Sequence, residues 1–137
     1  MKALVDTNVV LDVLLARTQF ASEATRVFSL VEESEIEASL CATTLSTIDY
    51  LLKQSLLRVQ ATQAIRGLLK LFEIAPVNRS VLERAIESKI ADFEDAVLEQ
   101  AAYLIGADAI ITRNTKGFRK SAIKAVDPVE FLSALDL

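Results

Sequence analysis

Short apolar runs alternate along the whole chain with longer segments whose apolar residues recur at helical spacing. The segment 21–35 is typical of the second kind, because Ala24, Val27 and Val31 fall on one face of a helix. We expect strands at 2–5, 36–42, 72–77, 108–112 and 124–126. We expect helices at 8–16, 21–35, 43–57, 59–72, 78–88, 92–106 and 127–135.

Residues suited to helix ends mark several of these boundaries. The threonines that open segment 43–57 are expected to cap its helix, and Ser80 to cap the helix of the segment around it. Asp127 followed by Pro128 is typical of a helix start, and Gly106 of a helix stop.

The alternation of strands and helices indicates the fold class. The expected strands are apolar runs rather than apolar–polar alternations, which is typical of a parallel sheet covered by helices on both faces. The sequence therefore predicts an α/β fold, a three-layer α/β/α sandwich with a central, mainly parallel sheet of four or five strands. In such sheets ligands bind at the carboxyl ends of the strands.

The composition indicates one globular domain over residues 1–137, with 52% hydrophobic and 25% charged residues. A single cysteine, Cys41, is consistent with a reducing compartment, so we expect a soluble cytoplasmic protein. Asp6, Asn8 and Asp12 interrupt the apolar N-terminal run, and we therefore expect neither a signal peptide nor a membrane segment.

The chain has no histidine, which excludes imidazole as a general base or metal ligand. A net charge of −4 argues against broad coating of nucleic acid.

Polar side chains follow three of the expected strands where each strand ends. The carboxyl ends of parallel strands meet at one edge of a sheet, so these side chains are expected to lie together. They are Asp6, Thr7 and Asn8 after the first strand, Thr44, Ser46 and Thr47 after the second, and Thr112, Arg113 and Asn114 after the fourth.

The start of the helix at 92–106 is expected at the same edge. Its connection to the next strand is so short that the helix must run antiparallel to that strand. At ~1.5 Å per residue the helix is roughly 20 Å long, comparable to the strand with its loop. Its first residues Asp92, Glu94 and Asp95 therefore return to the carboxyl edge, and Asp6 and Asp95 are expected to be neighbours.

Each of these residues also has an ordinary structural interpretation. Asp6 would cap the following helix, Asn114 would be a turn residue, and Asp92 with Asp95 would form a capping box. Three further acids are expected to be solvated, to interact with a helix dipole or to lie in turns: Asp12, Asp49 and Asp108.

The ordinary interpretations do not explain why carboxylates converge on one edge with no matching cation. Carboxylates packed together repel one another unless they are protonated or bridged by a metal ion. With oxygen ligands only, the ion should be hard, so we expect Mg²⁺ or Mn²⁺.

The segment 113–124 carries five basic residues and no acidic one: Arg113, Lys116, Arg119, Lys120 and Lys124. Basic side chains beside an acidic metal site suit a phosphodiester, because the metal takes the scissile phosphate and the cations its neighbours. More often, however, such a run of charged residues is simply a solvent-exposed loop. Phe118 is expected to anchor the loop in the core.

Four segments resemble the PIN domain family in order and spacing over essentially the whole chain. They are "LVDTNVVLD" (4–12), "DFEDAVLEQAA" (92–102), "AIITRNTKGF" (109–118) and "VDPVEFL" (126–132). The chain is most similar to small bacterial stand-alone PIN proteins of the VapC toxin type. The resemblance implies a Mg²⁺- or Mn²⁺-dependent ribonuclease, often a homodimer and often silenced by an antitoxin protein.

Residue by residue, the acidic cluster of the family corresponds to only part of this sequence. Its first acid corresponds to Asp6, supported by Asn8, and the acid of its late helix to Asp95, with Asp92 just upstream. The family position after the fourth strand, often Asp, is Asn114 here, beside Thr112.

The family's acid on the helix after the second strand is missing, because that register gives Thr47. The nearest carboxylate, Asp49, comes two residues later, over half a helical turn away. These departures predict one metal ion rather than two, and weak or lost activity.

The resulting hypothesis is metal-assisted hydrolysis of RNA. Asp6 and Asp95, with Asp92 nearby, would hold the metal. The residues expected to orient groups at the site are Asn8, Thr47, Thr112 and Asn114, and those expected to contact the RNA backbone are Arg113 and Lys116.

Alternative functions remain open from the sequence. The first is a weakened PIN-like module that binds RNA or a protein partner. The second is a haloacid-dehalogenase-type phosphatase with Asp6 as nucleophile, although that chemistry requires an acid where Asn8 stands. Apolar residues in segments 50–57 and 65–72 exceed the obvious needs of a small core, and a homodimer or an antitoxin-binding surface would use them. For each segment taken alone, an ordinary core helix explains the apolar residues at least as well.

Overall fold

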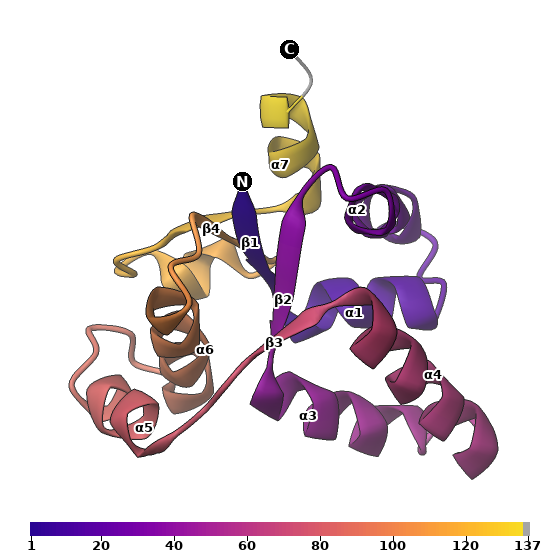
Figure 1. Cartoon of the computed structure of the whole chain (residues 1–137), viewed down its shortest axis with the longest axis horizontal. Helices are drawn as coiled ribbons and strands as arrows, with labels where there is room; N and C mark the ends of the chain where they lie inside the picture. The colour runs from indigo at the N-terminus through magenta and orange to yellow at the C-terminus, as the bar shows by residue number, and fades with distance from the viewer. Residues whose placement is uncertain (136–137) are drawn as a thin grey trace.

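The computed structural model describes residues 1–135, in which a five-stranded sheet lies between two layers of helices (Figure 1). Residues 136 and 137, the end of the expected domain, lie outside the described part. The strands are β1 (Lys2–Val5), β2 (Glu37–Cys41), β3 (Glu73–Ala75), β4 (Ala109–Ile111) and β5 (Lys124–Val126). The helices are α1 (Thr7–Leu14), α2 (Ala21–Glu32), α3 (Ala42–Leu52), α4 (Arg58–Leu71), α5 (Arg79–Ile86), α6 (Phe93–Leu104) and α7 (Pro128–Leu135), with a 3₁₀ turn η1 (Thr115–Phe118).

The strand order is β3-β2-β1-β4-β5, and every neighbouring pair is parallel. The predicted parallel α/β sandwich is therefore confirmed, with five strands. Strand β1 is central, pairing Leu4 with Ser39 of β2 on one side and with Ile110 of β4 on the other. The chain order reverses between β1 and β4, and in open parallel sheets ligands bind at such a reversal. Asp6 and Thr112, which follow these two strands, flank this point.

The two faces of the sheet carry separate cores. Ala3, Val5 and Leu40 face the layer of α1, α2, α3, α4 and α7, whereas Leu4 and Ile110 face α5 and α6 (Figure 1). All five side chains are fully buried. Burial on both faces explains why the strands read as continuous apolar runs. Within residues 1–135, no helix has the length and apolar character needed to cross a bilayer.

Helix starts differ from expectation at two places. Helix α3 begins directly after β2 with Cys41 as N-cap and no side-chain cap, so the expected threonine cap is wrong. The cap of α5 is Asn78 rather than Ser80, because the Asn78 side chain accepts a hydrogen bond from the backbone N–H of Val81 at 2.9 Å. Both helices begin before the hydroxyl residues that were expected to cap them, α3 at Ala42 and α5 at Arg79.

Two glycines are expected to respond in opposite ways to alanine. Gly67 lies inside α4 with open space around the position of a Cβ, whereas Gly106 ends α6 with φ of 69°. Gly67→Ala should raise the free energy of unfolding by about 0.5–1 kcal/mol. Gly106→Ala should lower it by about 1 kcal/mol, because the left-handed backbone strains any Cβ. Urea denaturation of the wild type and both variants tests the two signs, and a shift of both in the same direction would contradict the prediction.

Candidate functional site

A pocket of about 240 Å³ lies at the carboxyl edge of the sheet, between the end of β1 and the start of α6. Its lining residues are Asp6, Thr7, Asn8, Leu11, Arg17, Thr43, Thr44, Glu94, Asp95 and Leu98. Asp6 and Asp95 thus line one pocket, as their expected proximity requires. The antiparallel path of α6 brings its first turn back to the edge where β1 ends.

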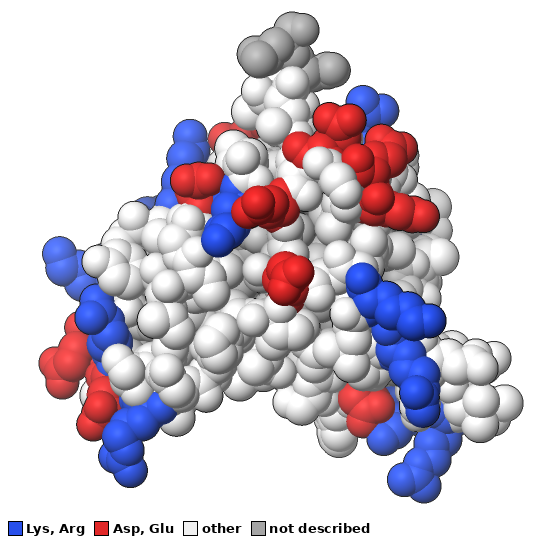
Figure 2. Space-filling model, viewed as in Figure 1, with Lys and Arg blue, Asp and Glu red and all other residues white. Residues whose placement is uncertain are grey.

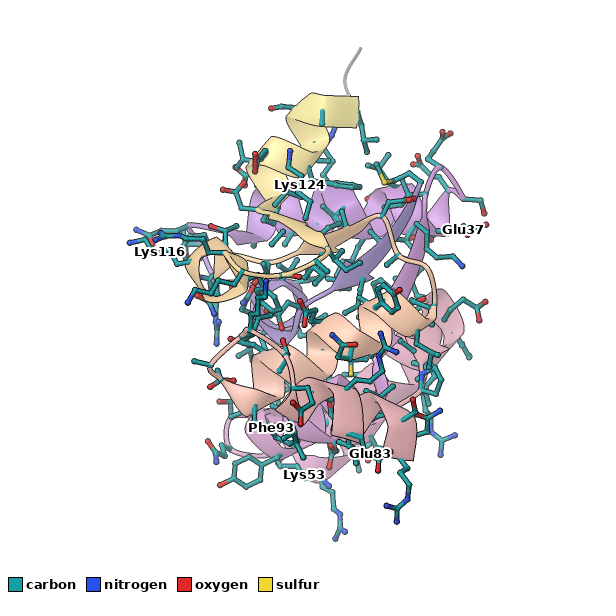
Figure 3. All side chains as sticks on the ribbon, turned by 90° about the vertical axis from the view of Figure 1, so that its left-hand side faces the viewer. Glu37, Lys53, Glu83, Phe93, Lys116 and Lys124 are labelled. Carbon is teal, nitrogen blue, oxygen red and sulfur yellow. The ribbon has the colours of Figure 1, made fainter. Side chains whose placement is uncertain are left out.

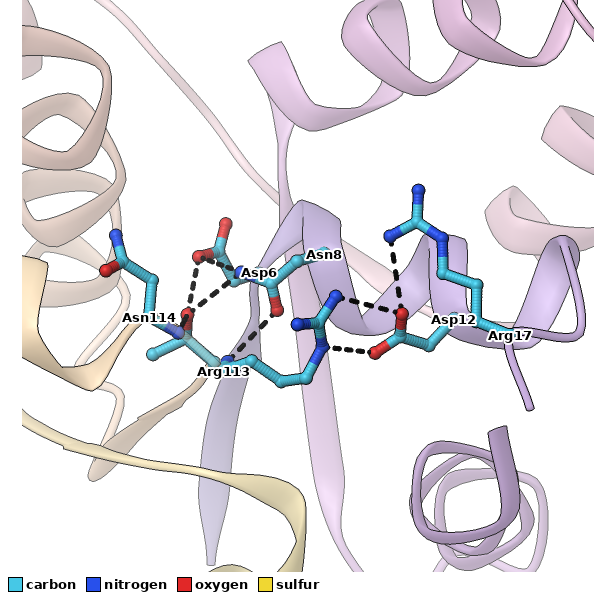
Figure 4. A network of polar contacts seen from close by, with 7 residues as sticks. Asp6, Asn8, Asp12, Arg17, Arg113 and Asn114 are labelled. Carbon is cyan, nitrogen blue, oxygen red and sulfur yellow. Dashed lines mark hydrogen bonds and ion pairs between the residues drawn. The ribbon is translucent and has the colours of Figure 1, made fainter. Parts of the chain in front are cut away.

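The Asp6 carboxylate is buried and accepts three hydrogen bonds from neutral donors, of which Figure 4 shows the two from side chains. The backbone N–H of Thr7 donates to Oδ1 at 2.7 Å, and the Thr112 hydroxyl donates to Oδ2 at 2.7 Å. The Asn8 amide also donates to Oδ2, at 3.2 Å. Burial raises the pKa of Asp6 above its usual range, and these hydrogen bonds only partly oppose the rise. A carboxylate has about four acceptor positions, so one position on Oδ1 remains for a further ligand.

Asn8 connects Asp6 to the loop after β4. Its Nδ2 also donates to the Thr112 hydroxyl oxygen at 3.2 Å, and its Oδ1 accepts the backbone N–H of Arg113 at 3.0 Å. The Thr112 hydroxyl oxygen in turn accepts the backbone N–H of Asn114 at 3.0 Å. Asn8 and Thr112 therefore fix the orientation of the Asp6 carboxylate relative to this loop.

Asp95 lies half-buried in the first turn of α6, where its backbone N–H donates to the N-capping Asp92 carboxylate at 2.9 Å. Its own Oδ2 accepts a long 3.4 Å hydrogen bond from the Asn114 amide. Burial, followed by the negative charges of Asp92, Asp6 and Glu94, raises the pKa of Asp95 to about 6. The fold therefore holds carboxylates together against their mutual repulsion.

Gly117 allows η1 to approach this site closely. A Cβ at this position would lie 2.5 Å from Nδ2 of Asn114 and 3.0 Å from Oδ2 of Asp95. Its backbone N–H donates to Oδ1 of Asn114 at 3.3 Å. Any larger residue would displace the Asn114 amide from Asp95.

The donor set fits one divalent cation. Asp6 and Asp95 offer oxygen only, which suits Mg²⁺ or Mn²⁺, and a cation would relieve the repulsion that raises the pKa of Asp95. Within residues 1–135 no three acidic or thiol side chains are grouped closely enough to hold a metal together. The remaining ligands of such an ion would therefore be water, which is usual for Mg²⁺.

Comparison with known proteins agrees with this geometry. Residues 2–116 match the PIN domain family. The chain belongs to the PIN domain family. No curated protein sequence matches it.

Three solved structures show how far the likeness extends. A toxin–antitoxin complex from Klebsiella pneumoniae matches with 25% identity and a TM-score of 0.70 over 92% of this chain and 97% of the other. VapBC2 from Rickettsia felis, bound to a DNA fragment from its promoter, matches with 15% identity and a TM-score of 0.73 over 93% and 98% of the two chains. VapC20 from Mycobacterium tuberculosis, described as a sarcin–ricin loop cleaving toxin, matches with 16% identity and a TM-score of 0.69 over 85% and 93%.

Two other predicted site residues of this PIN domain, Asp92 and Thr47, do not line the pocket. Asp92 caps α6 from outside and lines a neighbouring hollow instead. Thr47 donates its hydroxyl to the backbone carbonyl of Thr43 at 3.1 Å, and it is Thr44, one turn earlier, that lines the pocket. The Thr44 hydroxyl is the acceptor of a 3.1 Å hydrogen bond from Thr7.

Four basic side chains surround the neighbouring hollow of about 350 Å³, which also includes Asp92 and Gly117. They are Lys89, Lys116, Arg119 and Lys120. Figure 3 shows Lys116 projecting outward from the η1 segment. The segment is held down by Phe118, which is 2% exposed as expected, and by Glu99, whose carboxylate accepts the backbone N–H of Ala122 at 2.9 Å. The sequence did not indicate Lys89 or Glu99.

The expectation that Asp12 is solvated is wrong, because its side chain is completely buried. Arg113 donates to both oxygens of Asp12, from Nε at 2.6 Å and from Nη2 at 3.1 Å (Figure 4). The Arg113 guanidinium also lies 3.9 Å from the centroid of the Phe20 ring. Arg17 adds a single contact of 3.4 Å to Oδ1. Asp12 therefore holds the Arg113 guanidinium, which the sequence analysis assigned to the RNA backbone.

The Asp12–Arg113 pair is expected to be important for stability. Asp12→Asn removes a buried charge that orders the α1 and β4 loops together, so we expect the free energy of unfolding to fall by about 2–4 kcal/mol. Asp49→Asn is the matched control, because its ion pair with Lys53 is partly exposed and should contribute less than about 1 kcal/mol. Denaturation in urea compares the two variants, and equal losses would show that Asp12 has no special role.

The repulsion at Asp95 predicts a pH-dependent gain from removing its charge. Since the folded state raises the pKa of Asp95 to about 6, folding favours the protonated form, and stability is lost as pH rises from about 4 through 6. In EDTA, Asp95→Asn should therefore stabilise the protein at pH 7.5, by about 1 kcal/mol after allowance for solvent screening, and much less at pH 4.5.

Thermal unfolding of the wild type and Asp95→Asn at both pH values measures this difference. Glu94→Gln removes one charge from the same helical turn and should change the melting temperature less. A gain for Asp95→Asn that is equal at the two pH values would contradict the assignment of the shift to Asp95.

Proposed function

We propose that this PIN domain is a metal-dependent ribonuclease, the toxin component of a toxin–antitoxin pair. The observation that supports it most is the placement of Asp6 and Asp95 in one pocket at the β1–β4 reversal of the sheet. PIN nucleases generally use divalent metal ions, and the oxygen-only donor set here suits Mg²⁺ or Mn²⁺.

The roles of the residues follow from their contacts. Asp6 and Asp95 would hold the ion, and Thr112 and Asn8 keep the buried Asp6 carboxylate in one orientation. Asn114 would orient Asp95 through its amide. A bound divalent ion would acidify water and neutralise charge on the scissile phosphate. Asp92, the exposed N-cap of α6, lines the neighbouring hollow rather than the pocket, so it would contribute negative potential without binding the ion directly.

The basic hollow beside the pocket supports RNA as the substrate. Lys116 and its three basic neighbours line a hollow that includes Asp92 and Gly117, so a phosphodiester backbone crossing it would reach Asp95. Arg113 keeps its place by hydrogen-bonding Asp12 rather than a phosphate. On this side of the site, phosphate contacts would therefore come from Lys116 and the hollow around it.

Exposed apolar side chains on α3, on α4 and between them support a protein partner. Tyr50, Leu57 and Leu69, which belong to the segments expected to carry an apolar surplus, are more than half exposed, and so is Val59 on α4. The similar Klebsiella and Rickettsia structures are toxin–antitoxin complexes, which favours an antitoxin as one such partner, and a second copy of this chain is the other. A small reading frame with a DNA-binding pattern beside this gene would support the antitoxin.

A PIN module that binds RNA or a partner without cutting is the second candidate. It is favoured because no three acidic or thiol side chains within the described residues are grouped closely enough to hold a metal ion together. Calorimetry separates the two: binding of Mn²⁺ or Mg²⁺ below millimolar concentration supports the nuclease, and no heat at millimolar metal supports the binding module.

The ribonuclease proposal predicts Mn²⁺-dependent cleavage of single-stranded RNA that requires both aspartates. Asp95→Asn should lower kcat/KM at least about 100-fold, since one of two charged ligands is lost, and Asp6→Asn should do the same. Asp95→Asn is the safer test of the site, because Asp6 is buried in a hydrogen-bond network that an amide would disturb. Asp49→Asn serves as the control. Cleavage that persists in both site variants would show that Asp6 and Asp95 do not form the active site.

A further inference from the structure

Arg17, a residue that no sequence motif marks, brings positive charge to the pocket that holds Asp6 and Asp95. Of the residues that line the pocket, it alone is a Lys or Arg, beside the carboxylates of Asp6, Glu94 and Asp95. A phosphodiester entering this pocket would meet three negative charges, so a nearby guanidinium has a direct electrostatic role.

The backbone of Arg17 is fixed although its side chain is loosely held. Ala16 before it has φ of 48°, and this left-handed residue turns the chain at the end of α1. The Arg17 N–H donates to the Asp12 carbonyl at 3.0 Å, while its own carbonyl accepts the N–H groups of Phe20 and Ala21 at 2.9 and 2.8 Å. These bonds set the point from which the side chain reaches the pocket.

The guanidinium of Arg17 makes one long contact. Its Nη1 lies 3.4 Å from Oδ1 of Asp12, and its side chain is 40% exposed. That oxygen already accepts a hydrogen bond from Arg113, which also binds the other oxygen. No other side-chain hydrogen bond of Arg17 occurs within residues 1–135.

Arg17 can therefore leave Asp12 without stranding a buried charge. Removing the sole partner of a buried carboxylate is strongly destabilising, but here Arg113 remains with two short hydrogen bonds. Releasing the Arg17 contact forfeits one partly exposed ion pair, which contributes less than about 1 kcal/mol. Asp12 thus holds Arg113 firmly and Arg17 lightly.

We propose that Arg17 leaves Asp12 to bind a phosphate of the RNA backbone beside Asp6 and Asp95, as a substrate-binding residue of this pocket. This proposal rests on the proposed function only for the identity of the substrate. A guanidinium suits the task, because its planar array of donors contacts two phosphate oxygens at once.

RNA binding in EDTA tests this contact without cleavage. A fluorescent single-stranded RNA is titrated with the wild type, Arg17→Gln and Arg17→Lys over a range of salt concentrations. Arg17→Gln should raise Kd about three- to tenfold and reduce the slope of log K against log salt by about 0.7, the value for one phosphate contact on a single strand. Arg17→Lys should keep the slope and lose part of the affinity.

Arg66→Gln on α4 is the matched control, because it removes the same charge from an exposed position away from the pocket. Its Kd and slope should change less. Equal losses in Arg17→Gln and Arg66→Gln would overturn the proposal in favour of a general charge effect. A fall in stability as large as that of Asp12→Asn would overturn it in favour of a structural role.

Cleavage in Mn²⁺ separates this proposal from the proposed function. If the wild type cuts RNA, Arg17→Gln should lower kcat/KM about tenfold, and unchanged kinetics together with unchanged binding would overturn the contact. If the wild type binds RNA without cutting it, the ribonuclease proposal fails, while the effect of Arg17→Gln on binding still decides the Arg17 contact.

Discussion

The buried carboxylate of Asp6 is the constraint on which the carboxyl edge of this PIN domain depends. A charge at the end of the central strand is costly unless donors surround it. Three donors do so, from the start of α1 and from the residue after β4. These bonds join β1 to the loop that carries Asn114 and the basic segment, so the same hydrogen bonds fix the geometry of the pocket and the local folding of this edge. Figure 2 shows a mainly acidic group at the upper right of the face it presents, and acidic and basic side chains side by side along its left edge.

The protein compensates two buried acids in different ways, and the contrast indicates which one is functional. Asp12 is balanced inside the protein by Arg113 and Arg17, and nothing further is needed there. Asp6 meets neutral donors only, and its charge helps to raise the pKa of Asp95. Carboxylates in a pocket that have perturbed pKa values and form no ion pair are typical of a functional site. The fold therefore leaves negative charge unbalanced at one point, and this point faces the cavity.

Sequence reasoning located the strands and the edge because both follow from local pattern. The apolar runs mark strands buried on both faces, and a parallel sheet then places Asp6 beside Thr112 without further information. It misjudged Asp12 because the partner of that residue is 101 positions away and comes from a loop whose path no periodicity encodes. The position of Arg17 in the pocket was not predicted for a similar reason. It depends on the left-handed backbone of Ala16, which no sequence pattern marks. The cap of α5 was predicted wrongly because Asn78 and Ser80 are both good capping residues, and only the geometry of the preceding loop determines which of them caps the helix.

The separation of charge at this edge accounts for how a protein of net charge −4 would select RNA. Long-range attraction is weak for such a protein, so binding must come from local groups within about a Debye length of the phosphates. The hollow lined by Lys116 and its neighbours supplies them, and Glu99 and Phe118 hold that segment against α6. The carboxylates of the pocket beside it oppose a phosphate, and a bound metal ion and Arg17 would each offset part of that repulsion. Metal and RNA would therefore bind cooperatively. The metal ion would neutralise carboxylates that repel the phosphate, and the phosphate would offset the positive charge of the metal ion and of the nearby basic side chains.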